Sequence, residues 1–248
     1  MTADTAPGTG TIVYGGYADL LKPESPWVIG GFAGWQYREP DAVVIVQNGT
    51  LRVTVMPLTR GHDAVQILDN AKHMYFSRET FAVPPGGALS VELDIRARKF
   101  NGVPDDFYDG FVSLNLLDFS TGLAIDFFVS NESYATVYAR LPFPGTQVAA
   151  AEGEQKYFAL FKEQPLPNGP QRRHRYRIEY DHGADELSFF VEGQLVNREV
   201  GAPKMESFVA ALGIMTEKDI VDGKRVSCHG QGMEAEWSPL TITRRAAR

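Results

Sequence analysis

The chain has 248 residues, of which 44% are hydrophobic, so it is long enough to bury a full core, and its length allows one domain or two. The formal net charge of −7 argues against a nucleic-acid partner, because such proteins usually present a basic stripe. Cys228 is the only cysteine, which excludes an internal disulfide and a thiolate-rich metal site. No apolar run approaches the ~20 residues of a membrane span, and residues 1–10 lack the pattern of a secretory signal. We therefore expect a cytoplasmic protein without a membrane partner.

Short runs of alternating polar and apolar residues, separated by turns rich in Gly or Pro, predict β-strands along the whole chain. The clearest hairpin turns at Asn48-Gly49, a pair that tolerates the positive φ angles of a type I′ turn. About a dozen strands without a helix require two packed layers of β-structure. The prediction is an all-β, two-sheet antiparallel sandwich in a single domain over residues 1–248. Its expected strands are residues 43–46, 51–56, 72–76, 88–97, 111–119, 123–129, 134–141, 157–161, 176–180, 187–191, 209–215 and 240–243.

Two successive segments carry a family resemblance: RYRIEY at residues 175–180 and LSFFVEGQLV at residues 187–196. They resemble the back-sheet hairpin of the concanavalin A-like lectin and glucanase superfamily, where a strand of the type r-y-x-i-x-y precedes l-x-f-y-v-D-G-x-x-v. Glu192 stands here at the position where that superfamily commonly has Asp. The resemblance implies a jelly-roll sandwich that binds its ligand on the outer face of a curved front sheet.

The activities of that superfamily do not follow from the resemblance. Its retaining glucanases carry acid and nucleophile on one strand, as Glu-x-Asp-x-x-Glu or Glu-x-Asp-x-Glu, and no segment matches either pattern. The nearest strand, residues 91–96, contains only Glu92 and Asp94. The loop cluster of Asp, Asn and His with which legume-type lectins hold metals is also missing from the sequence. We expect neither a metal nor another cofactor.

The hairpin at residues 111–129 predicts which side chains face outward. If Phe119 lies opposite Gly122 across a two-residue turn, the apolar residues of both strands share the inner face. Asn115 then lies directly opposite Asp126 on the outer face, together with Phe128. This register places a carboxylate and an amide side by side on the front sheet.

For the following strand, residues 134–141, the alternation of polarity predicts the orientation. Ala135, Val137, Ala139 and Leu141 are predicted to face the core, so that Tyr134, Tyr138 and Arg140 join the outer face. Asp126, Tyr138 and Arg140 are then the candidate catalytic residues, and Asn115, Tyr134 and Phe128 are candidate ligand contacts. The alternative is a solvated sheet face on which Asp126 and Arg140 form a weak surface pair.

Further candidates are weaker. His73 and Tyr75 share one strand face and could line the groove, although a structural histidine is the more common case. Trp35 could stack on a sugar or plug the N-terminal end of the sandwich. The acidic run at residues 105–109 could hold calcium or form a solvated turn, and residues 217–219 are expected to decorate a loop.

Two hypotheses follow for the function. The first is a metal-independent acid–base enzyme, a hydrolase, lyase or cyclase, that acts on a carbohydrate or hydroxylated metabolite in the front-sheet groove. The alternative is a lectin-like module that binds a carbohydrate or small molecule there without catalysis. The enzyme is the favoured hypothesis by analogy, because a free-standing cytosolic domain lacks the appended catalytic partner that binding modules usually serve.

Overall fold

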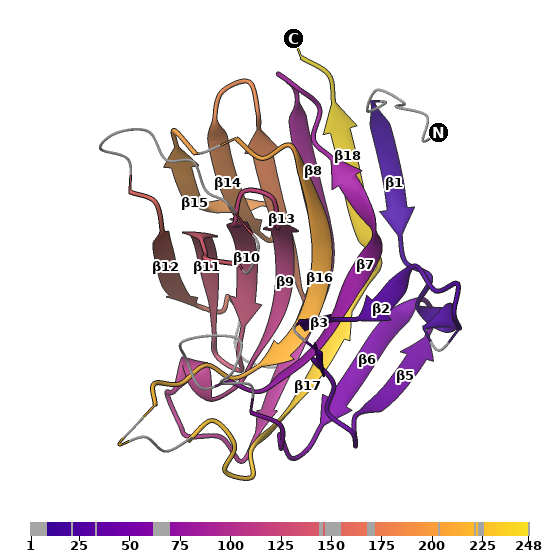
Figure 1. Cartoon of the computed structure of the whole chain (residues 1–248), viewed down its shortest axis with the longest axis vertical. Helices are drawn as coiled ribbons and strands as arrows, with labels where there is room; N and C mark the ends of the chain where they lie inside the picture. The colour runs from indigo at the N-terminus through magenta and orange to yellow at the C-terminus, as the bar shows by residue number, and fades with distance from the viewer. Residues whose placement is uncertain are drawn as a thin grey trace.

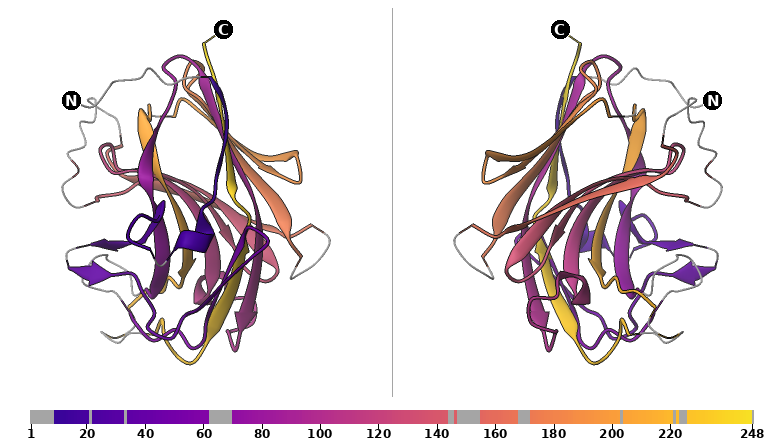
Figure 2. Two further views of the ribbon diagram at one scale, coloured as in Figure 1. Left: turned by 90° about the vertical axis from the view of Figure 1, so that its right-hand side faces the viewer. Right: turned by 90° about the vertical axis from the view of Figure 1, so that its left-hand side faces the viewer.

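A computed structural model describes residues 9–20, 22–32, 34–61, 70–143, 146, 155–167, 172–202, 204–220, 222 and 226–247. Residues 1–8, on which part of the expectation about a secretory signal depends, lie outside these ranges. Two antiparallel sheets contain nearly all of the regular structure, as the sequence predicted, and Figure 2 shows them edge on as two layers. Two short 3-10 turns, η1 (Tyr17–Asp19) and η2 (Phe107–Asp109), accompany the strands. No helix in the described ranges has the length and apolar character that a membrane crossing requires.

Within the described residues the front sheet has seven strands, several of which can be followed side by side in Figure 1. Their spatial order is β12 (Phe158–Pro165), β11 (Ser133–Arg140), β10 (Leu123–Val129), β9 (Phe111–Asp118), β16 (Ser207–Met215), β7 (Lys72–Ala82) and β2 (Trp27–Ile29). Strands far apart in the chain therefore become neighbours: β9 pairs with β16, and β16 pairs with β7.

The part of the chain that the structure describes contributes nine strands to the back sheet. Seven of these strands follow one another in the spatial order β15 (Gln194–Val200), β14 (Glu186–Val191), β13 (His174–Asp181), β8 (Ala88–Phe100), β17 (Gly232–Trp237), β6 (Thr50–Val55) and β5 (Val43–Gln47). The other two strands branch from β8, which also pairs with β18 (Leu240–Arg245), and β18 pairs with β1 (Gly10–Tyr14). A separate small hairpin consists of β3 (Gly31–Phe32) and β4 (Trp35–Gln36).

Turn residues fix the register of the back-sheet hairpins. Asn48 and Gly49 have φ angles of 53° and 76°, as a type I′ turn between β5 and β6 requires. Glu192 and Gly193 do the same between β14 and β15, with φ angles of 50° and 77°. The Glu192 carboxylate accepts hydrogen bonds from the Arg175 amide and from the His174 ring, both at 3.1 Å. An acidic side chain at this position therefore ties the turn to the start of β13.

The main hydrophobic core fills the space between the two sheets. It includes large, fully buried side chains from both layers, among them Trp237, Tyr176, Phe127 and Phe189. The Phe127 ring packs edge to face on Phe189, with ring centres 5.3 Å apart. The core residues of β9 and β10 are the ones that the predicted register assigned to it.

The front sheet is buried on both faces in its central strands. Every residue of β9 and β10 is buried, as are all but the first residue of β11. A second apolar cluster lies on the outer face, where Tyr37 and Phe107 from outside the sheet pack on side chains such as Phe128 and Met74. Alternation of polarity therefore distinguishes the two faces poorly in these strands.

Candidate functional site

The register predicted for the β9–β10 hairpin is confirmed. Asp126 lies opposite Asn115, and Phe128 lies opposite Ser113. These four side chains alternate with core residues, so they belong to the outer face of the front sheet. The Asn115 amide donates to the Ser113 hydroxyl at 2.8 Å and to the Ala211 carbonyl at 3.2 Å, which fixes its orientation beside Asp126.

The predicted orientation of β11 is wrong. Val129, a core residue, pairs with Tyr134, and Ile125, also in the core, pairs with Tyr138. Directly paired residues share a face, so Tyr134, Tyr138 and Arg140 point into the sandwich, and the small residues of β11 face outward. The cause is the two-residue turn Asn131-Glu132, where the Ser130 amide donates to the Ser133 carbonyl at 2.8 Å. This turn sets the register, whereas the apolar alternation misled because both faces are buried.

Tyr138 and Arg140 are thus separated from Asp126 by the thickness of the sheet. The Tyr138 ring packs on Phe158 at 4.9 Å, and the Tyr134 hydroxyl donates to Gln164 at 2.9 Å. Of the three predicted catalytic residues, the structure leaves only Asp126 on the outer face.

His73 and Tyr75 also face inward, so neither lines the outer face as expected. The His73 ring accepts a hydrogen bond from the Glu39 amide at 3.2 Å and contacts the Tyr75 hydroxyl at 3.0 Å. Burial, followed by the charge of Arg38, lowers the pKa of His73 to about 4. These contacts describe a neutral structural histidine.

Trp35 lies on the small β3–β4 hairpin, which projects outward beyond the front sheet in Figure 2. The indole is 41% exposed and faces the Arg60 guanidinium, 5.5 Å from the ring centre. It does not plug the sandwich.

Two ionisable groups, Lys72 and Glu217, interact electrostatically with Asp126. Lys72 extends from β7, on the same face as Met74, and Glu217 follows β16. We call Asp126, Asn115, Lys72 and Glu217 the polar cluster. Asp126 is only 4% exposed, and its Oδ1 atom has no hydrogen-bond partner among the described residues. A buried carboxyl oxygen without a partner is costly unless a ligand or water satisfies it.

The three ionisable groups perturb one another. Burial raises the pKa of Asp126 well above its ordinary value, and the charge of Glu217 adds to the shift. Burial also raises the pKa of Glu217, against the opposing charge of Lys72. Burial lowers the pKa of Lys72 to about 8, although Glu217 and Asp126 favour its charged form. Mutually shifted groups of this kind concentrate at functional sites.

The sequence did not identify Lys72 or Glu217 as site residues. Glu217 lies in a loop, as expected, but it is only partly exposed, and its carboxyl interacts electrostatically with Lys72. The Lys72 ammonium lies 5.3 Å from the centre of the Tyr37 ring, a cation–π contact. One available signal for Lys72 was its spacing, because it alternates with Met74 and Phe76 on an otherwise apolar strand face.

Aromatic rings continue the outer face beside the polar cluster. Phe111 stacks on Phe128 with ring centres 4.5 Å apart, and Phe107 stacks on Phe111 at 5.6 Å. Tyr108 and Phe161 follow at 5.3 Å from each other and are 37% and 36% exposed. Half-exposed rings next to hydrogen-bonding groups suit the apolar face of a sugar.

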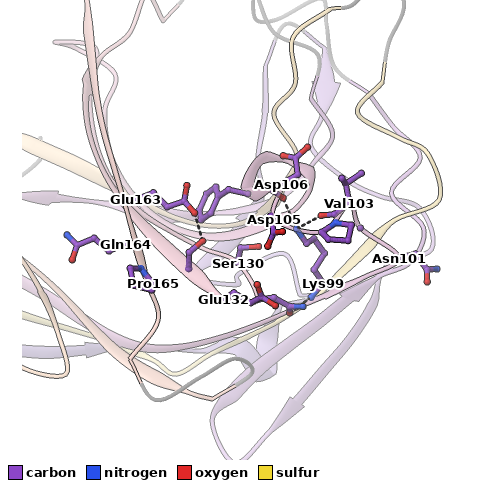
Figure 3. Close-up of a pocket in the computed structure, with 15 residues that line it drawn as sticks. Lys99, Asn101, Val103, Asp105, Asp106, Ser130, Glu132, Glu163, Gln164 and Pro165 are labelled. Atoms are coloured by element: carbon purple, nitrogen blue, oxygen red, sulfur yellow. Dashed lines mark hydrogen bonds between the residues drawn. The ribbon is translucent and has the colours of Figure 1, made fainter.

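A cleft of about 670 Å³ opens at one end of the sandwich, beside Phe107. Figure 3 shows Glu163 and Gln164 on one side, Asp105, Asp106 and Lys99 on the other, and Ser130 between them with Glu132 below. Its polar groups are mostly exposed or already bonded: Lys99 Nζ donates to the Asp106 carbonyl at 2.7 Å. The polar cluster, with its buried unpartnered oxygen, is therefore the stronger candidate site.

Two carboxylates of the acidic run at residues 105–109, those of Asp106 and Asp109, pair with lysine or histidine side chains. Asp109 is fully buried and accepts from His229 Nε2 at 2.8 Å and from Lys218 Nζ at 3.1 Å. Asp106 also pairs with Lys218. In the part of the chain that the structure describes, no group of three or more His, Cys, Asp or Glu side chains is placed to hold a metal ion.

The two-sheet architecture is that of the concanavalin A-like jelly rolls, and solved structures of that class superimpose on it. A native glycosidic hydrolase matches with a TM-score of 0.62 and 13% identity, covering 96% of this chain and 97% of the other. The catalytic domain of an endo-1,3-beta-glucanase (laminarinase) from Thermotoga petrophila RKU-1 matches with a TM-score of 0.56 and 17% identity, over 96% and 98% of the two chains. The Bacillus licheniformis beta-glucanase matches with a TM-score of 0.56 and 12% identity, over 98% and 100%. At these identities the likeness establishes the fold.

Within that class, the chain belongs to the family of unknown function DUF6081, which matches residues 17–246. A comparison with curated protein sequences found no match.

The two-carboxylate pattern of the resembling glucanases is missing from the outer face of β10. The alternating outward positions carry Ala124, Asp126 and Phe128, hence one carboxylate. Glu92 and Asp94, the nearest sequence match, lie on β8 in the back sheet, where Asp94 accepts from Arg175 at 3.2 Å. The chemistry of this site therefore depends on Asp126 and on groups from other strands.

Proposed function

We propose that the protein is an acid–base enzyme that acts on a carbohydrate or a related hydroxylated metabolite held on the outer face of the front sheet. The observation that carries the proposal is Asp126, a buried carboxyl with an unpartnered oxygen beside Lys72 and Glu217. Burial raises the pKa of Asp126 well above its ordinary value, which favours the protonated form that a proton donor requires.

The neighbouring groups support this role. Substrate hydroxyls both donate and accept hydrogen bonds, so they can bridge an ammonium and a carboxyl. Asn115, held by Ser113 and Ala211, adds a further polar contact, and Tyr108 and Phe161 offer a stacking surface. Lys72 can stabilise negative charge that develops during proton transfer. Hydrolysis, elimination or cyclisation are the reaction classes that fit such a set.

A lectin-like binding protein is the second candidate. The specific observation in its favour is that Ala124 and Phe128 flank Asp126 on β10, so this strand supplies no second carboxylate for the double-displacement or single-displacement hydrolysis of a glycoside. The same stacking rings and polar groups would then serve binding alone.

The test compares wild type with Asp126→Asn and with Asp94→Asn, a matched control on the back sheet. Oligosaccharides of β-1,3-glucan and β-1,3-1,4-glucan are suitable probes, because the fold resembles enzymes named for acting on such chains. Calorimetry measures binding, and mass spectrometry of the products measures turnover. The enzyme proposal expects turnover that Asp126→Asn abolishes while binding is retained and Asp94→Asn has no effect.

Binding without turnover in every variant would support the lectin-like candidate. Turnover that is unchanged in Asp126→Asn would remove Asp126 from the mechanism. A complete lack of binding to these probes would contradict glucan as the ligand class, and the same variants would then be tested with smaller hydroxylated metabolites.

A further inference from the structure

The segment that carries Glu217 is tied to β7 immediately before Lys72. The Thr216 amide donates to the Ala71 carbonyl at 3.0 Å, and the Ala71 amide donates to the Thr216 hydroxyl at 2.8 Å. Thr216 is fully buried. This reciprocal pair fixes the chain on the N-terminal side of Glu217, next to the residue that bears the ammonium.

The C-terminal side of Glu217 is tied to a buried charge. Lys218 lies 3.1 Å from Asp109 Oδ1 and pairs also with Asp106. Asp109 accepts two further hydrogen bonds, from His229 at 2.8 Å and from the Val103 amide at 2.7 Å. Burial opposes ionisation of Asp109, but these donors hold its pKa below the ordinary value. A buried carboxylate with such partners is a firm anchor for Lys218.

Glu217 lies between these two ties. Its amide donates to the Tyr108 carbonyl at 2.9 Å, so Thr216 and Glu217 are held by their backbone amides and Lys218 by its side chain. The carboxyl interacts electrostatically with Lys72 and with Asp126. Without the anchors, an acidic side chain in a loop would turn toward solvent to avoid the cost of burial.

We propose that Asp109 and Lys218 are positioning residues for the polar cluster: through the Lys218 ion pair, the buried Asp109 holds Glu217 against Lys72 and Asp126. The inference rests on the proposed function for the role of the polar cluster, but the geometry that it asserts is testable without any ligand.

The test measures the titration of Lys72 by NMR of 13C-labelled lysines in the full-length protein, with the Lys72 signal assigned by Lys72→Arg. Glu217→Gln should lower the Lys72 midpoint below about 8, because the carboxylate favours the ammonium form. Lys218→Gln should lower it in the same direction, since it releases Glu217 from the anchor. Lys218→Arg keeps the charge and should leave the midpoint near that of wild type.

His229→Gln is the matched control. It removes another donor from the same buried carboxylate, yet His229 is remote in sequence from Glu217, so the Lys72 midpoint should stay unchanged. Should Lys218→Gln fail to fold, Lys218→Met tests the same link without burying an unpaired polar group.

Three results would overturn the inference. An unchanged Lys72 midpoint in Glu217→Gln would mean that Glu217 does not face Lys72. A shift in Glu217→Gln but not in the Lys218 variants would mean that Lys218 does not position it. Equal shifts in His229→Gln and Lys218→Gln would indicate a general loss of stability. Failure of the proposed function would appear instead in the glucan assays of Asp126→Asn, with the Lys72 shifts intact.

Discussion

Replacing Lys72 by methionine should stabilise the protein at neutral pH, because the ammonium is buried on an apolar sheet face. The fall of the Lys72 pKa from 10.5 to about 8 measures the cost of keeping the charge there, and at 1.36 kcal/mol for each pKa unit it corresponds to about 3 kcal/mol. Methionine has a similar length and no charge, and it would join Met74 and Met215 in the second apolar cluster. We therefore expect the free energy of unfolding to rise by up to about 3 kcal/mol.

The pH dependence of this gain identifies its cause. The folded pKa of Lys72 lies below the unfolded one, so the cost of the buried charge is present in full below pH 8 and is relieved as the pH rises toward 10.5. Urea unfolding, followed by the fluorescence of the buried Trp27 and Trp237, measures the difference between variant and wild type at each pH.

The gain should be largest near pH 7 and should vanish near pH 10.5. Lys22→Met is the control, because Lys22 is an exposed residue in a surface ion pair with Asp19 and its replacement should have a small effect. A Lys72→Met variant that loses stability equally at all pH values would refute the reasoning. Because stabilising changes in a functional site often reduce activity, the proposed function also predicts that the variant loses ligand binding or turnover.

Asp126→Asn should become more stabilising relative to wild type as the pH rises. The raised pKa of Asp126 means that the stability it contributes is present below pH 3.8 and is lost as the pH rises through the folded pKa. Thermal melts from pH 4 to 9 measure the difference, and a pH-independent difference would contradict the prediction. If Asp126 is the proton donor, turnover should fall as the pH rises through the same pKa, which a pH–rate profile measures. Gly213→Val should cost about 1–3 kcal/mol by overpacking, because even a Cβ there would lie 2.7 Å from the Ser113 hydroxyl; urea titration measures the loss, and unchanged stability would mean that β9 and β16 can move apart. Asp109→Ala should cost about 3–5 kcal/mol, because it leaves Lys218 without its buried partner; a loss below 1 kcal/mol in the same urea assay would show that the anchor is weak.

The sequence predicted correctly the hairpins whose register is set by their own turn residues. Asn48-Gly49 placed the first hairpin, and the two-residue turn after Phe119 gave the register that brings Asn115 opposite Asp126. The resemblance in residues 175–196 led to the correct sheet, where Glu192-Gly193 forms the tight turn. The single domain over the whole chain stays a prediction.

The orientation of β11 could have been predicted by the same argument. Counting across the turn Asn131-Glu132 pairs Val129 with Tyr134 and puts the tyrosines in the core. The alternation of polarity predicts the opposite orientation, and it fails where both faces of a strand are buried. As a result Tyr138 and Arg140 were assigned to a site that they do not reach.

Lys72 and Glu217 could not be assigned to the site in this way. They meet Asp126 only because β7, β16, β9 and β10 lie side by side in the front sheet, an order set by long-range pairing. Their residue types alone indicate solvated surface positions, since lysine and glutamate are rarely buried. The structure is needed to show that the sheet brings them together.

The titration of the Asp126 carboxyl tests the central claim most directly, by NMR of 13C-labelled aspartate with the signal assigned through Asp126→Asn. A desolvated Asp126 beside Glu217 predicts a midpoint well above 3.8 that falls in Glu217→Gln. An Asp126 midpoint near 3.8 that is the same in wild type and in Glu217→Gln would mean that water reaches the carboxyl freely. The proposed proton donor would then be an ordinary surface aspartate.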